Sequence, residues 1–363
     1  MFIHYTNSIS AHQLPLDRAI INIIGSDNFY YIYTNESLQG GAQEINSNEK
    51  WICKFDSKTN ILLKNAEIVL VGGLRPINVI EHRLAEGKIT LYMSERWFKP
   101  IPIFNEWLWL PGWLKLLYPP YFIMALRFAF LFKSKKYRYL PIGPHAAKDM
   151  ALICNIFFPF RFKKIKEIRQ SFIPWGDFVE KSKYDYFAQN KTPELKVLYI
   201  GRLLKLKHID DIIRAVKLLS NVKLLIVGNG PDEIRLKKIA NNQISFHNAV
   251  SLDQVREVMR AHDVVVFASN AFDGWGAVVQ EALSERVPVF GTYEAGASAA
   301  ILPESQLFHC GDYKTLSEML YKFQKNKENT NTNLPSDTYL STLPSDYTPD
   351  GAAKRLLNII KKM

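Results

Sequence analysis

The sequence has few cysteines, and even its most apolar stretch has no run long enough to cross a membrane. The cysteines Cys53, Cys154 and Cys310 have no close neighbour of their kind, so their spacing fits neither a disulfide framework nor a zinc site. In the Trp-rich stretch 97–138 the longest uncharged run is 116–126, whereas a membrane span needs about 20 apolar residues. The N-terminus lacks the basic start and apolar run of a signal peptide. These absences predict a cytoplasmic protein with reduced thiols.

Common phosphate-binding signatures are also missing. The glycine turn "GNGP" follows an apolar run, but it matches neither the GxGxxG fingerprint nor the GxxxxGK[ST] loop. No DxD motif near a strand end demands a metal ion. The acids of "IDD" at 209–211 are better explained by the start of a helix, where they interact favourably with its dipole.

Positive charge, by contrast, is abundant, with a formal net charge of +11. Such a balance favours anionic partners: nucleic acid, a phospholipid surface or a phosphorylated substrate. The cations are spread among tryptophans and prolines, and no RNA- or DNA-binding module is recognisable. We therefore expect no nucleic-acid partner, although a nucleic-acid-binding protein on a βα scaffold remains a remote alternative.

Apolar strands alternate with helical stretches in both halves of the chain, which predicts two α/β domains with parallel sheets. We expect a first domain over 1–180, a polar linker over 181–194 and a second domain over 195–345. Residues 346–363 should form a basic C-terminal helix.

The stretch 97–138 breaks this alternation and holds four of the seven tryptophans, Trp97, Trp107, Trp109 and Trp113. Cations gather at its C-terminal end, namely Lys133, Lys135, Lys136 and Arg138. Aromatic residues beside cations are typical of a membrane interface, so we expect contact with an anionic membrane surface. The alternative is a helix pair packed on the core of its own domain, since bulky aromatics also fill cores.

Two cations follow the first strand of the second half. "LKVLYIG" ends at Gly201, and Arg202 and Lys207 come next. Ligands of open α/β sheets bind outside the carboxyl ends of the strands, where two cations could neutralise a diphosphate. The alternative is a turn with ordinary surface charges.

The stretch "FDGWGAVVQEAL" places Asp273 before a glycine turn and Glu281 on the following helix. The amide groups available to an anion at this helix start belong to Gly274, Trp275, Gly276 and Ala277. A carboxylate such as Glu281 on an apolar helix needs a partner, and a ribose diol would be one. Alternatively, Asp273 caps the turn and Glu281 pairs with Arg286 or Arg202.

Taken in order, "GRLLKLK", "IVGNGP", "FHNAV" and "DVVVFAS…FDGWGAVVQEAL…VPVFGT" resemble the nucleotide-sugar-binding domain of retaining glycosyltransferases of family four. The resemblance covers roughly 195–310. It implies the GT-B architecture, in which two Rossmann-like doubly wound domains face a cleft, and a C-terminal helix that packs back on the first domain. "SER" at 94–96 and "PWG" at 174–176 more loosely resemble bacterial surface-polysaccharide members of the family.

The resemblance implies a role for each matching residue. Arg202 and Lys207 match the pair that holds the donor diphosphate. Asp273 and Glu281 match the acids of the E-x7-E motif, which lie beside the transferred sugar and at the ribose. The other donor-binding positions would be Gly201, Gly228, Gly274, Trp275, Gly276 and Ala277, with Asn248 and Val250 pairing with the base.

Two residues depart from the family pattern. Asp273 is one methylene shorter than the usual Glu, which would alter its reach to the sugar. His208 stands where glycine is common, which puts the local turn in question. In the first domain, His145 is the candidate to assist catalysis, and Glu95 and Arg96 are candidate acceptor contacts.

Together these features predict a retaining glycosyltransferase that moves a sugar from a nucleotide sugar, such as a UDP- or GDP-sugar, to a lipid-linked glycan of a capsule, lipopolysaccharide or other surface polysaccharide. It would act at the inner face of the cytoplasmic membrane, without a metal ion or other cofactor. The alternative within the same architecture is a nucleotide-sugar epimerase or a glycogen-type synthase.

Overall fold

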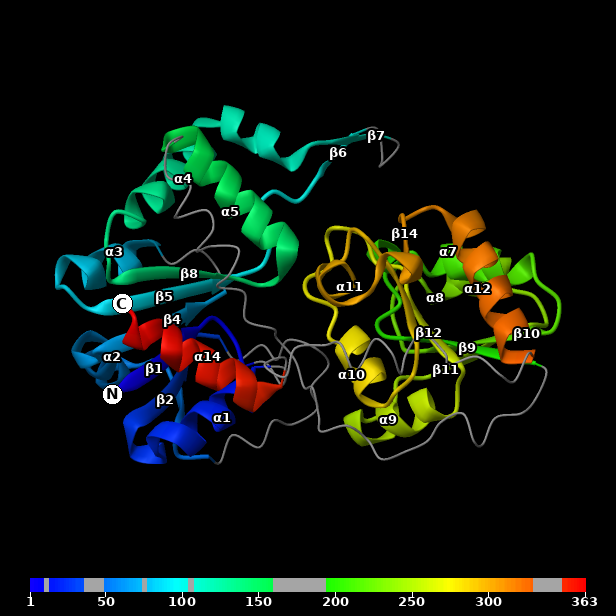
Figure 1. Ribbon diagram of the computed structural model, residues 1–363, viewed down its shortest axis with the longest axis horizontal. Coiled ribbons are helices and arrows are strands. Elements are labelled where there is room, and N and C mark those ends of the chain that lie inside the picture. Colours follow the sequence, from blue (N-terminus) through cyan, green and yellow to red (C-terminus); the bar gives the residue numbers. More distant parts are fainter. Residues whose placement is uncertain (10–12, 36–48, 74–76, 104–107, 159–193, 329–347) are drawn as a thin grey trace. The chain divides into compact units, whose positions relative to one another are not determined.

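The computed structural model divides the chain into two compact units (Figure 1). One unit comprises Met1–Gly176 with Ser345–Met363, and the other Asp177–Pro344. The structure describes all residues except 10–12, 36–48, 74–76, 104–107, 159–193 and 329–347. The expected linker 181–194 therefore lies outside the described residues, apart from Glu194.

The first unit is built on a six-stranded parallel sheet in the order β3-β2-β1-β4-β5-β8. Its strands are β1 (Phe2–Thr6), β2 (Phe29–Tyr33), β3 (Ile52–Lys54), β4 (Ile68–Gly72), β5 (Ile89–Ser94) and β8 (Tyr137–Pro141). The chain moves outward from β1 to β3, then returns to the other side of β1 for β4. This is the strand order of a Rossmann fold.

Helices cover both faces of this sheet. They are α1 (Leu14–Ile24), α2 (Ser57–Asn65), α3 (Ile77–Ala85), α4 (Pro119–Leu131), α5 (Gly143–Phe157) and α14 (Pro349–Lys361), with short turns η1 (Ser26–Asn28) and η2 (Gly112–Leu117). α2 to α5 share one apolar cluster with the sheet, to which Leu63, Ile80, Phe128 and Met150 contribute. The C-terminal helix α14 packs on α1, which confirms that the chain returns to its first domain (Figure 1).

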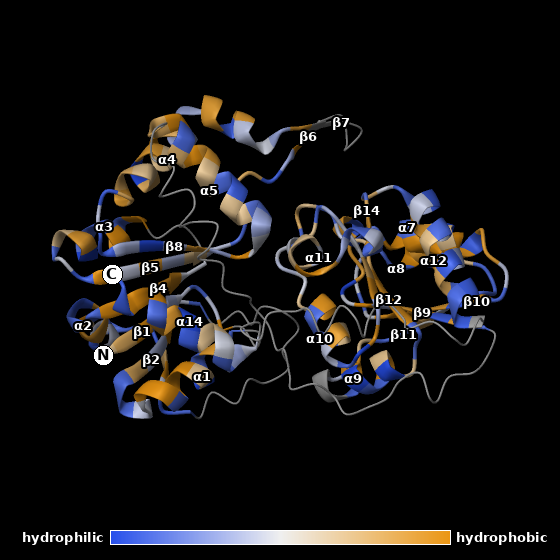
Figure 2. Ribbon diagram, viewed as in Figure 1, coloured by the Kyte–Doolittle hydropathy of each residue, from blue (hydrophilic) through white to orange (hydrophobic). Residues whose placement is uncertain are grey.

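The second unit repeats the plan, with the parallel order β11-β10-β9-β12-β13-β14. Its strands are β9 (Leu195–Ile200), β10 (Val222–Val227), β11 (Ile244–His247), β12 (Val264–Phe267), β13 (Val289–Thr292) and β14 (Leu307–Phe308). Figure 2 shows apolar residues along β9 and β12, as expected for strands buried on both faces.

Its helices are α7 (Ile209–Lys217), α8 (Glu233–Ile239), α9 (Leu252–Arg260), α10 (Val278–Ser284), α11 (Gly296–Ile301) and α12 (Tyr313–Glu328), with turns η4 (Lys205–Lys207) and η5 (Glu304–Gln306). α7, α8 and α12 form one apolar cluster with the sheet. α10 contacts β12 and β13 together with α9 and α11. Buried residues of α7 such as Ile209, Ile212 and Val216 recur every three or four positions, so one stripe of the helix faces the sheet.

The stretch 97–138 divides between core and surface. Trp97 is only 2% exposed and makes an edge contact with Phe128 of α4, so this tryptophan belongs to the core and not to a membrane interface. The strands β6 (Ile101–Ile103) and β7 (Leu108–Leu110) form an antiparallel pair. Trp107 lies outside the described residues. Among the residues described, no helix combines the length and apolar character needed to cross a membrane.

Candidate active site

The candidate site lies at the carboxyl edge of the second sheet, where β9 and β12 are neighbours. The loop after β9 contains η4, and the loop after β12 leads into α10. Strand order reverses between β9 and β12, because β10 continues on one side and β13 on the other. Such a switch point is where open α/β sheets bind their ligands.

Lys207 and Asp273 meet here, one from each loop. Lys207 Nζ forms an ion pair and a hydrogen bond with Asp273 Oδ2, and each side chain is only 16% exposed. Lys207 Nζ also lies 5.3 Å from the ring centre of Phe267, at the end of β12. The structure thus pairs the cation predicted to bind the diphosphate with the acid predicted to lie beside the transferred sugar. Their mutual attraction is stronger in this partly buried place than in bulk water.

Asn270 fixes the geometry of both loops, and the sequence analysis did not identify it. Its backbone N–H donates to Leu206 O at 2.9 Å, and its carbonyl accepts from Asp273 N–H at 3.1 Å. Its side-chain Oδ1 accepts from Phe272 N–H at 2.9 Å. An amide residue directly after the stretch "DVVVFAS" was the available signal.

The Gly-Trp-Gly turn is held rigidly before α10. Trp275 is buried, and its indole N–H donates to the buried Gln280. Gly276 has φ +86°, and a Cβ there would lie 2.5 Å from the Phe267 ring, so this position requires glycine. Ala277 precedes the first residue of α10. Gly274 N–H donates to Asp273 Oδ1 at 3.1 Å, as in the alternative in which Asp273 caps the turn.

Glu281 lies on α10 and is half-buried. Its backbone N–H donates to Ala277 O at 3.0 Å, and its carbonyl accepts from Ser284 Oγ at 2.8 Å. These bonds fix the backbone from which the carboxylate projects, eight residues after Asp273.

Arg202 is exposed at the start of the loop after β9. Its carbonyl accepts from the hydroxyl of Tyr199 at 2.9 Å. Burial raises the pKa of Tyr199 well above its usual value, and the charge of Asp273 raises it further, so this hydroxyl stays protonated. Tyr199 is a second residue of the site that the sequence analysis did not single out.

The predicted donor-binding glycines Gly201 and Gly228 touch each other. A Cβ at Gly228 would lie 1.9 Å from Gly201 O, and both residues have positive φ. Further along the same edge, Asn248 and Val250 follow β11. Between them Ala249 N–H donates to Asn229 Oδ1 at 3.1 Å.

The first unit gathers its own predicted residues at the carboxyl edge of its sheet. Glu95 and Arg96 follow β5, and His145 lies in the first turn of α5, directly after the neighbouring strand β8. Asp149 of α5 accepts from the backbone N–H groups of Trp97 and Phe98, both at 2.8 Å. Asp149 thus fixes the loop that carries the two candidate acceptor residues, and the sequence analysis missed it.

Comparisons with known proteins show similarity in the second unit and in the fold of the whole chain. Residues 182–336 match the family model of glycosyl transferases group 1. An uncharacterized glycosyltransferase of Methanocaldococcus jannaschii is 29% identical over 118 residues, a match that spans 30% of this chain and 30% of that relative. The second unit therefore carries the clearest sequence similarity, as the motifs predicted.

Solved structures resemble the whole chain. The apo form of a lipopolysaccharide outer core galactosyltransferase has a TM-score of 0.66 at 12% identity, with 99% of each chain covered. The Anabaena protein HepE, solved in complex with UDP, has a TM-score of 0.62 at 11% identity, with both chains covered completely. Residues 182–336 are thus similar to glycosyl transferases group 1, and the chain as a whole has the GT-B fold.

Proposed function

We propose that the protein is a retaining glycosyltransferase that moves one sugar from a nucleotide sugar to a lipid-linked glycan in surface-polysaccharide biosynthesis. The observation that supports this most directly is the Lys207–Asp273 pair at the switch point of the second sheet. It places a cation suited to a diphosphate and an acid suited to a sugar on adjoining loops, beside the glycine turn that precedes α10.

The chemistry follows from the charges that develop during transfer. As the bond to the donor sugar breaks, negative charge grows on the departing diphosphate. Lys207 would exchange Asp273 for this diphosphate, assisted by Arg202 and the amide groups of the Gly-Trp-Gly turn. Asp273, released from Lys207, would turn to the sugar hydroxyls, and Glu281 would bind the ribose. These cations could stabilise the leaving group without a metal ion.

A uridine nucleotide is the first donor to test. The Anabaena protein HepE has been solved with UDP and with UDP-glucose. We expect UDP at about 100 times its Kd to raise the thermal midpoint of unfolding by roughly 5–10 °C, because a ligand of the folded state alone stabilises that state. GDP and ADP at the same concentration should have a smaller effect.

The matched variants for this thermal-shift experiment are Glu281→Gln and Glu257→Gln. Glu257 is an exposed acid on α9, outside the site. Glu281→Gln should lose most of the UDP-induced shift, while Glu257→Gln should keep it. A full shift in Glu281→Gln would contradict the ribose role, and no shift with any nucleotide diphosphate would contradict the proposed donor class.

The lipid-linked acceptor is supported by an exposed apolar surface on η2 and α4. α4 packs Phe128 and Ala129 into the core but leaves other large apolar side chains exposed. We call the exposed set the α4 surface: Trp113, Leu117, Tyr118, Phe122, Ile123 and Phe130. Lys133 stacks over the Phe130 ring, with Nζ 4.0 Å from its centre, and Lys135 and Lys136 follow. Apolar side chains beside cations suit the boundary of an anionic bilayer.

We expect the double variant Leu117→Ser/Ile123→Ser to bind anionic lipid vesicles roughly tenfold or more weakly in a sedimentation assay. The reason is that burying each large apolar side chain contributes about 1.5–3 kcal/mol. Ile234→Ser is the matched control, since Ile234 is an exposed isoleucine of α8 in the other unit. Equal loss of vesicle binding in both variants would contradict the proposed membrane contact of the α4 surface. So would a protein that is retained on nucleic acid across a salt series and does not bind vesicles.

The first unit would then supply the acceptor site. Glu95 and Arg96 are the proposed acceptor contacts, and His145 would assist the transfer from the neighbouring helix start. Because Asp149 holds the loop after β5 through two backbone bonds, it would act by positioning these residues.

A further inference from the structure

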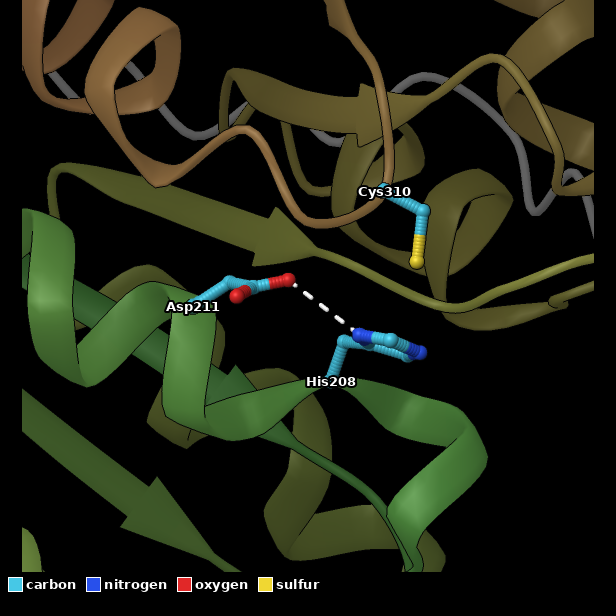
Figure 3. Close-up of side chains that lie close together, drawn as sticks. All are labelled: His208, Asp211 and Cys310. Carbon is cyan, nitrogen blue, oxygen red and sulfur yellow. Dashed lines mark hydrogen bonds and ion pairs between the residues drawn. The ribbon is translucent and has the colours of Figure 1, made fainter. Parts of the chain in front are cut away.

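Three side chains with metal-binding atoms converge beside the candidate site. His208, Asp211 and Cys310 each offer one ligand atom, and these atoms lie within 4.8 Å of one another. His208 Nδ1 lies 3.2 Å from Asp211 Oδ2, and the Cys310 thiol points toward both (Figure 3). They come from the end of η4, the first turn of α7 and the loop after β14.

His208 occupies a backbone conformation that histidine seldom adopts. Its φ of 46° and ψ of 41° lie in the left-handed region, which costs a residue with a Cβ about 1 kcal/mol or more and costs glycine little. Glycine would therefore suit this turn better. Residues with a strained backbone cluster at functional sites, which favours a functional role for the His208 imidazole.

The three groups are also held by further contacts, as metal ligands in proteins generally are. Asp211 Oδ2 accepts from Gly311 N–H at 2.9 Å. The other ring nitrogen of His208, Nε2, lies 3.3 Å from the Asn270 amide. Cys310 N–H donates to Glu294 Oε2 at 3.1 Å.

The surroundings of the thiol are negative. Burial raises the pKa of Cys310, and the carboxylates of Glu294, Asp211 and Asp210 raise it further. These acids disfavour a lone thiolate, but the same charges attract a cation that could neutralise it.

We propose that His208, Asp211 and Cys310 bind one thiophilic divalent metal ion, with Zn²⁺ as the probe. One imidazole nitrogen, one carboxylate oxygen and one thiolate sulfur are ligands that zinc accepts at about 2.0–2.3 Å, with a fourth position left to water. On binding, the metal–sulfur bond replaces the S–H bond and the proton passes to solvent.

This metal site goes beyond the proposed function and is distinct from any metal on the donor diphosphate. It would tie the loop that carries Lys207 to the loop after β14, within the second unit. The spacing of the cysteines had indicated no zinc site. Cys310 is distant in the sequence from His208 and Asp211, and only the fold of the sheet edge brings the three ligands together.

The test uses the full chain stripped of metal and titrated with Co²⁺, which absorbs in the near ultraviolet when a thiolate binds it, and with Zn²⁺ against a chromophoric chelator. We expect one site per chain and a sulfur-to-cobalt band that Cys310→Ser abolishes. Cys53→Ser, the control at a cysteine of the other unit, should keep the band. Mg²⁺ should not compete.

His208→Gly separates the metal site from a purely structural role. Glycine relieves the left-handed strain, so the metal-free variant should melt at the same temperature as the parent or higher, yet bind Zn²⁺ roughly 10–100-fold more weakly. Unchanged Zn²⁺ affinity in this variant would overturn the proposal. So would a cobalt band that survives Cys310→Ser.

Discussion

Lys207→Ala is expected to lower the rate of sugar transfer by roughly 10²–10³-fold or more, while the second unit stays folded. Lys207 is a largely buried cation at the switch point, paired with Asp273 and packed near the Phe267 ring. The variant removes the group that would meet the negative charge of the departing diphosphate. It also leaves the Asp273 carboxylate without this cation, which would repel the same diphosphate.

The measurement is the initial rate of transfer from the donor identified by thermal shift, with kcat and KM determined separately. Lys205→Ala is the matched control, because Lys205 is an exposed lysine of the same short turn η4. It should retain nearly full activity. Equal losses in the two variants would mean that the loop acts only through its overall charge, and full activity in Lys207→Ala would refute the role of Lys207.

The sequence could predict that Lys207 and Asp273 lie at the same edge of the sheet, because each residue follows a strand. Both strands were recognisable as apolar runs, and the carboxyl ends of parallel strands share one edge. The direct contact could not be predicted, since it depends on the order of strands in the sheet, which local periodicity does not encode. Asn270 was missed for a related reason: its partners Leu206 and His208 lie across the switch point.

The stretch 97–138 shows a different limit of the sequence. Its composition predicted contact with an anionic membrane surface, with a helix pair packed on the core as the alternative, but composition does not say which side chains of a helix face the core. The structure buries Trp97 and Phe128 against each other and leaves Phe122 42% exposed and Ile123 55% exposed. The core interpretation therefore holds for Trp97 and Phe128, whereas membrane contact by the exposed residues stays a prediction.

His208 illustrates what a departure from a family pattern can reveal. The resemblance marked it as a position where glycine is common, and the structure places it in the left-handed region that glycine favours. The turn therefore has a backbone conformation that suits glycine, although histidine occupies it. What the sequence could not provide was the position of Cys310, whose thiol reaches the same place from the loop after β14.

Gly228→Ala is expected to destabilise the second unit by about 3 kcal/mol or more. Gly228 has φ +146°, and its Cβ would lie 1.9 Å from the carbonyl oxygen of Gly201. Neither backbone can easily withdraw, because Gly201 N–H donates to Val227 O at 3.0 Å and Gly228 N–H donates to His247 O at 2.9 Å. The first effect of the substitution is therefore on the fold and not on a ligand.

Gly311→Ala is the matched control, because Gly311 also has positive φ, +89°, but a Cβ there would meet no described atom within 4 Å. Gly311→Ala should lower the free energy of unfolding by only about 1 kcal/mol, the cost of placing a residue with a Cβ in a left-handed backbone conformation. Amide hydrogen exchange of peptides from β9 and β10 measures both, since it reports the opening of this unit within the full chain. Equal costs in the two variants would mean that the loops after β9 and β10 move apart readily. In that case the glycine at 228 would be retained for the approach of a ligand, as the resemblance implied, and not for the contact between these two loops.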